Sequence, residues 1–394
     1  MKKIIALILA ATLTIGCSVL FTSCGNEKSD EKVVYIGVFE PQSGDNGAGG
    51  KQEILGMQYA NSKTPTVEIG GETYKVELVI ADNESSTDKA VTAASTLVSK
   101  GCSVVLGSYG SSVAIAGSDT FANANIPVIG VTCTNPQVTE GNDHYFRICF
   151  LDPFQGTVLA NYANETLKAK TVYCIGQLGN DYDQGLINYF KQAADTLGMK
   201  VVTAEFPENN SDFTSYLTNA KNEGADVIFA PCSISYAQLI VEQCVAQGIN
   251  IPLIASDTWD SNVIVNAAKD KDLSISVTTF YQEGGNPEFD NGIKEWLNAE
   301  GNEQYLTNNG GNDLIAAVTA MGYDAYYTAL EALKAAGSTD SAAVKAALPD
   351  VEYTGVSGSI KFNETGDAVR DTAYIKKVDT KAGAWTFVGK QGIK

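Results

Sequence analysis

The stretch VVLGSYGSSVAIAGSDTFANANIPVIGV, residues 104–131, decides the fold. Its first residues, 104–107, form a short apolar run that is typical of a buried strand. The pattern from residue 112 to about 125 is helical, and residues 127–131 form a second strand-like run. A strand, a helix and a strand in this succession predict two parallel strands of one sheet joined by a crossover helix.

The same alternation extends in both directions along the 394 residues. Upstream of this stretch we expect strands at 33–39 and 74–80 and helices at 50–63 and 88–100. After Asp152 the rhythm restarts, with expected helices at 155–167, 183–197, 213–222 and 235–247 and expected strands at 171–175, 200–204, 226–230 and 252–255. The last third is less regular, with expected helices at 290–297, 313–336 and 338–348 and strands at 358–362 and 373–378. Two such series predict an α/β protein of two doubly wound parallel-sheet lobes, and the length also favours two domains.

The N-terminus has the pattern of a secretion signal. Two lysines precede an apolar run at 4–21, and the chain turns polar directly after Cys24. The segment Phe-Thr-Ser-Cys that ends at Cys24 resembles the lipobox of a bacterial lipoprotein. We therefore expect a signal peptide at 1–23, acylation of Cys24 and a tether at 24–32. Acylation of Cys17, or an uncleaved N-terminal anchor, are the alternatives.

Composition narrows the class of protein. The net charge of −19 argues against nucleic-acid binding, which favours a basic surface. None of the six cysteines that follow Cys24 forms a C-x-x-C pair. No zinc site, other metal or cofactor is therefore expected. Buried free thiols are the preferred interpretation of these cysteines, with disulfides as the alternative; they are Cys102, Cys133, Cys149, Cys174, Cys232 and Cys244.

Candidate binding residues follow the strands, because ligands of open parallel sheets bind beyond the carboxyl ends of the strands. A glycine-rich turn at 41–50 follows the first strand. Ser111 and Ser112 open a helix after another strand, where hydroxyls and free N–H groups suit an anion. Thr132 and Thr134 follow the next strand. Each feature alone is also explained by ordinary helix capping.

In the second series, polar and aromatic residues occupy the corresponding loops. Tyr182 follows one strand and Ser233 follows another. Asp257 comes directly after the strand at 252–255, where its carboxylate could accept an ammonium group or cap the next turn. Trp259 could line a side-chain pocket or cover a cation.

Taken together, these residues resemble the leucine/isoleucine/valine-binding type of solute-binding protein, which serves ATP-driven importers. The resemblance covers about residues 33–390 and depends on the order of its landmarks. These are Gln42-Ser43-Gly44, Gly107 to Ser112, Ile126 to Ile129, Thr134-Asn135-Pro136, Phe146-Arg147, Asp152 to Gly156, Tyr323-Asp324-Ala325 and Gly355 to Gly358. It implies the type I periplasmic-binding-protein fold, with two lobes joined by three crossover strands.

The resemblance also implies roles for single residues. Ser112 and Thr134 would donate hydrogen bonds to the carboxylate of an amino-acid ligand. The carbonyl of Thr132 and the carboxylate of Asp257 would accept from the ligand ammonium. Tyr182 would contact the ligand when the lobes close. Both ends of an α-amino acid would thus be paired, as a dry cleft requires.

Two positions depart from the pattern that the resemblance implies. Gly49 stands where branched-chain binders have an aromatic residue, and Ser233 stands where they often have tyrosine. Both changes remove apolar wall and make strict branched-chain specificity doubtful. A larger ligand side chain, or a polar one near Asn46 and Ser233, is the expectation that follows.

The lobes implied by the resemblance are 33–148 plus 283–353 and 149–282 plus 354–394, with crossovers near 147–152, 276–283 and 354–358. The expected function is extracytoplasmic capture of an α-amino acid, by lobe closure, for the permease of an ABC importer. The expected location is the bacterial cell membrane, reached only through the N-terminal lipid.

Three alternatives stay open. An enzyme is disfavoured because His144 is the single histidine and neither G-x-S-x-G nor H-E-x-x-H occurs. A protein that presents its ligand to a separate sensor is the second alternative. The third keeps the fold and binds an amide, urea or an aromatic acid, but a ligand without an amine would leave Asp257 buried and unpaired.

Overall fold

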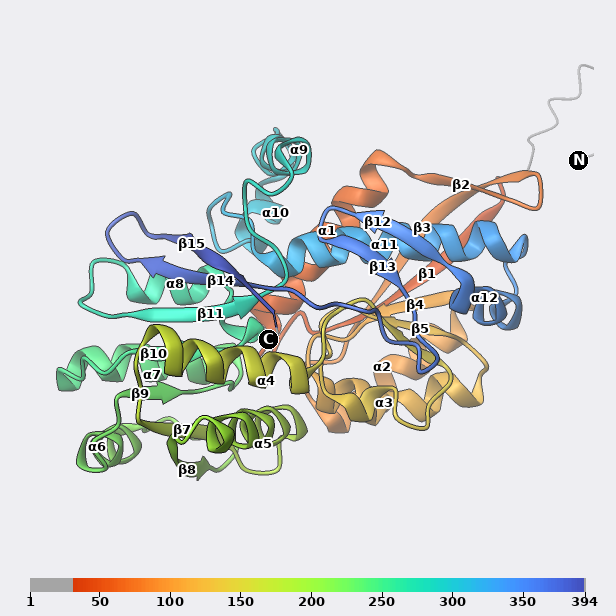
Figure 1. Ribbon diagram of the computed structural model, residues 1–394. Coiled ribbons are helices and arrows are strands. Elements are labelled where there is room, and N and C mark those ends of the chain that lie inside the picture. Colours follow the sequence, from red (N-terminus) through yellow and green to blue (C-terminus); the bar gives the residue numbers. More distant parts are fainter. Residues whose placement is uncertain (1–30, 393–394) are drawn as a thin grey trace, which may run out of the picture. The chain divides into compact units, whose positions relative to one another are not determined.

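The computed structural model describes residues 31–392, which form two large sheets and one hairpin (Figure 1). The first sheet has the strand order β2-β3-β1-β4-β5-β6 and the second has the order β15-β14-β11-β10-β9-β7-β8. No helix within 31–392 has the length and apolar character that a membrane span requires. The signal peptide, Cys24 and most of the tether lie outside the described residues.

The strands are β1 (Val33–Glu40), β2 (Thr66–Ile69), β3 (Glu72–Asp82), β4 (Val104–Gly107), β5 (Val128–Gly130), β6 (Tyr145–Arg147), β7 (Thr171–Gln177), β8 (Lys200–Phe206), β9 (Val227–Phe229), β10 (Leu253–Ala255), β11 (Ile275–Thr279), β12 (Glu352–Gly355), β13 (Gly358–Lys361), β14 (Ala373–Asp379) and β15 (Ala384–Gln391). The α-helices are α1 (Gly47–Lys63), α2 (Thr87–Ser99), α3 (Ser111–Asn123), α4 (Asp152–Asn161), α5 (Asp181–Thr196), α6 (Thr214–Asn222), α7 (Ile234–Gln247), α8 (Asn262–Ala268), α9 (Pro287–Leu297), α10 (Glu303–Asn308), α11 (Ala317–Ala336) and α12 (Ser341–Ala347). Short helical turns are η1 (Pro136–Val138), the π-helical η2 (Tyr162–Thr166), η3 (Asp257–Trp259) and η4 (Leu348–Asp350).

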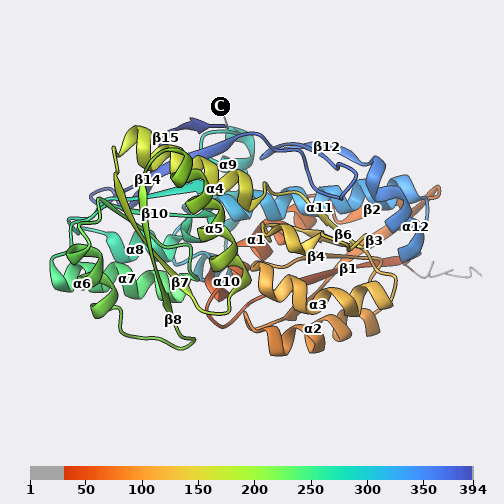
Figure 2. The same ribbon diagram turned by 60° about the horizontal axis from the view of Figure 1, so that its bottom comes forward.

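Helices cover both faces of the first sheet because its central strands are apolar on both sides (Figure 2). Along β1, Val34, Ile36 and Val38 point to the core that contains α1 and α11. Phe39 points to the opposite core, which contains α2 and α3. This alternation is the two-residue period of a strand.

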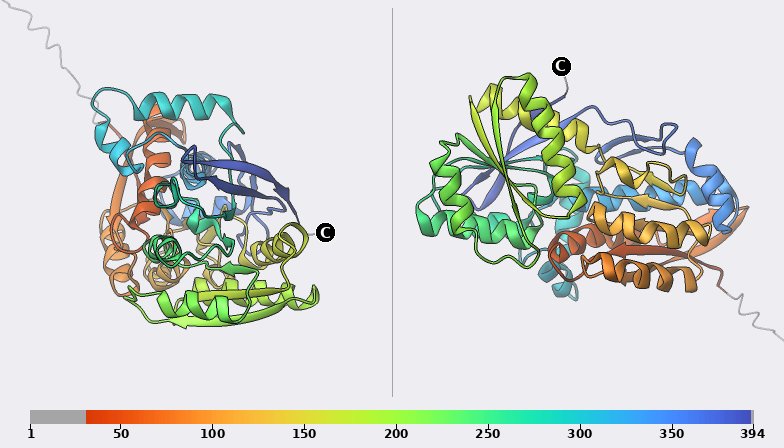
Figure 3. Two further views of the ribbon diagram at one scale, coloured as in Figure 1. Left: turned by 90° about the vertical axis from the view of Figure 1, so that its left-hand side faces the viewer. Right: turned by 90° about the horizontal axis from the view of Figure 1, so that it is seen from below.

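The second sheet is built in the same way (Figure 3). Val172 and Cys174 of β7 pack against α4 and α5. Tyr173 and Ile175 of the same strand pack on the other face, against α6, α7 and α8. The predicted α/β class with two helix-covered sheets is confirmed. All six cysteines of the described part are buried and free.

The sheets are dominated by parallel strands, as predicted, and antiparallel strands join them at one edge of each. β2 pairs antiparallel with β3 at one edge of the first sheet. β14 pairs antiparallel with β11, and β15 with β14, at one edge of the second. These edge strands are reached by a short turn or by a connection that reverses direction, whereas the central strands are joined by crossover helices.

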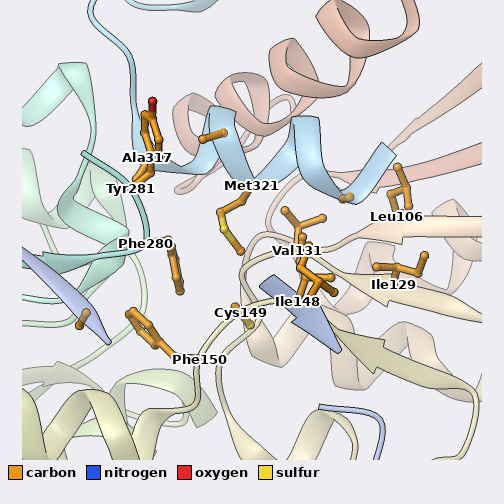
Figure 4. Packing of buried hydrophobic residues seen from close by; sticks show 14 of the residues in the cluster. Leu106, Ile129, Val131, Ile148, Cys149, Phe150, Phe280, Tyr281, Ala317 and Met321 are labelled. Carbon is orange, nitrogen blue, oxygen red and sulfur yellow. The ribbon is translucent and has the colours of Figure 1, made fainter. Parts of the chain in front are cut away.

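The connections between the sheets share one hydrophobic core (Figure 4). The rings of Phe150, after β6, and Phe280, after β11, lie with centroids 4.2 Å apart. A third connection runs from β13 to β14, and there Asp367 forms an ion pair at 2.7 Å with the buried Arg147. Residues 354–358, expected to form this crossover, belong instead to the hairpin of β12 and β13, which lies against α11. The proposed lobe boundaries remain a prediction.

Glycines allow α1 to pack very closely against α11. A Cβ on Gly56 would lie 2.0 Å from the carbonyl oxygen of Thr319, and a Cβ on Gly322 would lie 2.1 Å from that of Glu53. Only glycine permits such backbone contact. The crossing fixes α1, and therefore Glu53 and the loop before the helix, relative to the first sheet.

Candidate ligand-binding site

Loops at the carboxyl ends of strands from both sheets surround a cavity of about 490 Å³. From the first sheet come the loops after β1, β3, β4 and β5, and from the second those after β7, β8, β9 and β10. The volume is typical of a site for a small ligand. Its position follows from the rule for open parallel sheets.

Seven of the ten residues that sequence analysis singled out line this cavity. They are Asn46, Ser111, Ser112, Thr132, Tyr182, Ser233 and Asp257. The other three, Gly49, Thr134 and Trp259, lie behind the lining. The parallel strands explain the convergence, since their carboxyl ends meet at one edge of each sheet.

Asp257 is the buried charge of the cavity, with 3 % of its surface exposed. Its Oδ1 accepts hydrogen bonds from Gln155 Nε2 at 2.7 Å and from the Tyr182 hydroxyl at 2.8 Å. Burial raises the pKa of Asp257 to about 6, and these two hydrogen bonds oppose the shift. A cation beside Asp257 would restore the ionised form, so the residue is suited to receive an ammonium group.

The N-terminus of α3 supplies hydrogen-bond donors to the same cavity. Ser111 Oγ accepts from the backbone N–H of Asn135 at 3.1 Å, and Ser112 Oγ accepts from that of Asp181 at 3.0 Å. Each hydroxyl is thereby oriented as an acceptor and keeps its own hydrogen to donate. Together with the helix dipole, these hydroxyls suit a carboxylate.

Hydrogen bonds join the two sides of the cleft around the cavity. Asn46 Nδ2 donates to Ser233 Oγ at 3.1 Å, and Asn46 Oδ1 accepts from the N–H of Ile234 at 3.2 Å. The Tyr109 hydroxyl donates to the carbonyl of Thr258 at 2.9 Å. These contacts connect loops of the first sheet to loops of the second, so the cleft is closed in this structure.

Trp259 does not form a pocket wall, contrary to one expectation. It is fully buried in the core beneath β10, and its Nε1 donates to the carbonyl of Cys232 at 3.0 Å. The reason is geometric: residues 257–259 form a helical turn that directs Asp257 toward the cavity and the indole into the core. Thr134 is also fully buried, and its carbonyl accepts from the N–H of Asp152 at 3.1 Å.

Gly49 lies outside the lining because Tyr109 occupies the space beside it. A Cβ at position 49 would lie 2.5 Å from the Tyr109 ring. The aromatic side chain that the resemblance implies at position 49 is thus replaced by one from the loop after β4. Tyr109 was not among the predicted site residues, although it stands in the same loop as Ser111 and Ser112.

Buried acidic and amide residues behind the lining were also missed. Thr132 donates a hydrogen bond to Glu53, which is completely buried on α1. Burial raises the pKa of Glu53 to about 7, and burial together with the charge of Glu53 raises that of Glu40. Gln155 donates to Asp257 from α4. Spacing along the sequence gives no signal for them, because they reach the site from within helices or the core.

Two α/β lobes that close over a polar cavity at their strand ends define a two-lobed ligand-binding protein. The chain belongs to the periplasmic binding protein family, whose model matches residues 33–384. This membership confirms the predicted fold and places the chain among solute-binding proteins of extracytoplasmic location.

Solved structures and curated relatives agree with this assignment. The leucine-binding protein LivK of Thermotoga maritima is 29% identical, with a TM-score of 0.80 over 91% of this chain and 99% of that chain. LivJ of Streptococcus pneumoniae, solved with isoleucine, is 26% identical, with a TM-score of 0.77 over 92% and 100%. Leu/Ile/Val-binding protein homolog 1 of Brucella abortus is 28% identical over 85% of this chain and 87% of its own length.

Proposed function

We propose that this chain is the extracytoplasmic solute-binding component of an ABC importer and that it captures a free α-amino acid. The observation that carries the proposal is that one cavity contains both a buried carboxylate and hydroxyl donors at a helix N-terminus. These groups are complementary to the two ends of a zwitterion. The similarity to LivK and LivJ supports the same assignment.

Asp257 accepts the α-ammonium group in this mechanism. Ser111 and Ser112 donate to the α-carboxylate. Because the carboxylate donors belong to the first sheet and Asp257 to the second, a bound zwitterion contacts both lobes. The ligand therefore binds the closed form better than the open form and shifts the equilibrium toward closure.

Acylation at Cys24 and delivery to permease subunits are further parts of the proposal. The lipid would keep the binding protein close to its permease, since each buried CH₂ contributes about 0.8 kcal/mol to membrane affinity. Metabolic labelling with a fatty-acid analogue, lost on Cys24→Ala but retained on Cys17→Ala, tests the anchoring site.

An aromatic acid is the competing ligand, because a solute-binding protein of Rhodopseudomonas palustris with a TM-score of 0.75 was solved with benzoate. That likeness, at 18% identity, concerns the fold. Asp257 argues against such a ligand, since an acid without an amine would place two carboxylates in one cavity without a cation between them.

A thermal-shift screen of the purified protein against the twenty common amino acids and benzoate tests the proposal. We expect at least one amino acid to raise the melting temperature and Asp257→Ala to abolish the effect. The exposed Asp195, on α5, provides the matched control, because Asp195→Ala removes a carboxylate without touching the cavity. Stabilisation by benzoate alone, or by no amino acid, would refute the proposal.

A further inference from the structure

The charges that line the cavity have one sign. Five carboxylates line it, and within residues 31–392 no lysine, arginine or histidine does. The five are Asp45, Glu84, Asp88, Glu208 and Asp257. A cleft lined by one sign of charge concentrates ligands of the opposite sign. The zwitterion requires only one of these carboxylates. Of the other four, Asp45 is half-buried and the remaining three are exposed.

The lining offers little apolar surface to a ligand side chain. Apart from the rings of Tyr109 and Tyr182, its apolar members are Val113 and Leu178, and Leu178 is 58% exposed. Asn46 and Ser233 hydrogen bond to each other across the cleft at 3.1 Å. A branched aliphatic side chain would find few apolar partners in this lining, so its burial would contribute little to affinity. The lining therefore suits a polar side chain.

Two of the carboxylates approach one corner of the cavity from opposite lobes. Asp45 follows β1 in the first sheet, and Glu208 follows β8 in the second. The exposed Glu208 is followed by Asn209, whose backbone N–H donates to the Tyr236 hydroxyl at 3.1 Å. Burial raises the pKa of Tyr236 to about 12, and the charges of Asp45 and Glu208 add to the shift. Asp45 also accepts from the Ser235 hydroxyl at 2.7 Å, which holds it at the cleft.

Closure of the lobes brings these two like charges together. Their repulsion opposes closure when the corner is empty of cations. A positive group between Asp45 and Glu208 would be attracted by both and would offset the repulsion only in the closed form. A ligand with such a group gains affinity through the closure equilibrium.

We propose that the ligand is an α-amino acid whose side chain carries a second positive charge, such as lysine or arginine. This inference rests on the proposed function, since Asp257 and the α3 N-terminus are assigned to the zwitterion. The side-chain cation lies at the corner formed by Asp45 and Glu208. The methylene groups of the ligand side chain pass along the polar lining around Asn46.

Isothermal titration calorimetry of the purified protein with lysine, arginine, leucine and norleucine tests the proposal. Norleucine is the matched ligand, because it has the straight side chain of lysine without the terminal ammonium. We expect lysine or arginine to bind at least tenfold more tightly than norleucine, and the difference to shrink as salt is raised.

Glu208→Gln tests the assigned corner, and Glu300→Gln is its control. Glu300 is exposed and lies outside the cavity lining. Its substitution changes the net charge by the same amount as Glu208→Gln without touching the cavity. We expect Glu208→Gln to weaken binding of the cationic amino acid at least threefold and Glu300→Gln to leave it unchanged. Asp45→Asn should act like Glu208→Gln, which guards against a local defect in one loop.

The outcomes separate the two proposals. Tighter binding of leucine or norleucine than of lysine and arginine would overturn the cationic ligand and leave amino-acid capture intact. Normal binding of lysine by both the Glu208 and the Asp45 variants would overturn it too. Absence of binding by every amino acid would overturn the proposed function, and this inference with it.

Discussion

Replacing Asp257 by asparagine should stabilise the ligand-free protein while abolishing amino-acid capture. The asparagine oxygen can still accept from Gln155 Nε2 and the Tyr182 hydroxyl, the two partners of Oδ1. The substitution therefore removes the charge with little change of shape. A residue that destabilises the empty fold and is needed for binding is typical of a functional site.

The magnitude follows from the pKa of Asp257, which burial raises from 3.8 to about 6. Because the folded state binds this proton more tightly than the unfolded state, the carboxyl contributes stability below pH 3.8 that is lost as pH rises through about 6. Each pKa unit corresponds to about 1.4 kcal/mol, so the charged form costs the empty fold about 3 kcal/mol at pH 7. Asparagine avoids this cost.

Urea unfolding of ligand-free wild type and Asp257→Asn, at pH 7 and at pH 4.5, measures the effect. We expect the variant to be more stable by about 1–3 kcal/mol at pH 7. At pH 4.5, inside the window between 3.8 and about 6, we expect about a third of that advantage to remain. Comparing the two proteins at each pH cancels the titration of buried acids other than Glu53 and Asp152, whose pKa the charge of Asp257 raises. A variant that is no more stable at pH 7, or a difference that does not depend on pH, would refute the reasoning.

Three further changes test the site and the frame around it. Ser112→Ala should weaken binding of the amino acid that the screen identifies, because a donor to its carboxylate is lost. We expect a loss of about 1 kcal/mol or more in calorimetry; unchanged affinity would assign that role to another residue. Gly49→Ala should lower the melting temperature, because its Cβ would lie 2.5 Å from the Tyr109 ring; adding Tyr109→Ala should relieve the clash, and no relief would contradict this cause. Arg147→Ala should destabilise the fold by about 3–5 kcal/mol in urea unfolding, because it leaves the carboxylate of Asp367 buried without its partner; a loss below about 1 kcal/mol would show that the pair contributes little.

Local patterns were enough to predict the frame of the protein and the edge at which the site lies. The periodicity of apolar residues predicts the alternation of strands and helices. The carboxyl ends of parallel strands must lie at the same edge of their sheet. For that reason Ser112, Thr132, Tyr182 and Asp257 could be predicted to lie near one another, and all four line the cavity. Their assigned contacts with a ligand stay a prediction.

Edges and connections were harder to predict, because they depend on pairing between distant segments. The expected parallel lobes carry antiparallel strands at their edges, since β2, β14 and β15 pair antiparallel with their neighbours. The crossover expected at 354–358 became part of a hairpin. Short strands carry little periodicity, so their partners are chosen by the surface that the rest of the fold leaves free.

The sequence by itself determined the α/β class, the two series of strands and helices and the strand-end loops, because each depends on neighbouring residues. Only the tertiary structure decided which side chains reach the cavity. Trp259 turned into the core two residues after Asp257, and Tyr109 filled the space beside Gly49. Asp45, after β1, and Glu208, after β8, line one cavity although they belong to different sheets. The direction of a side chain is set by what packs against it, and those neighbours are far away along the chain.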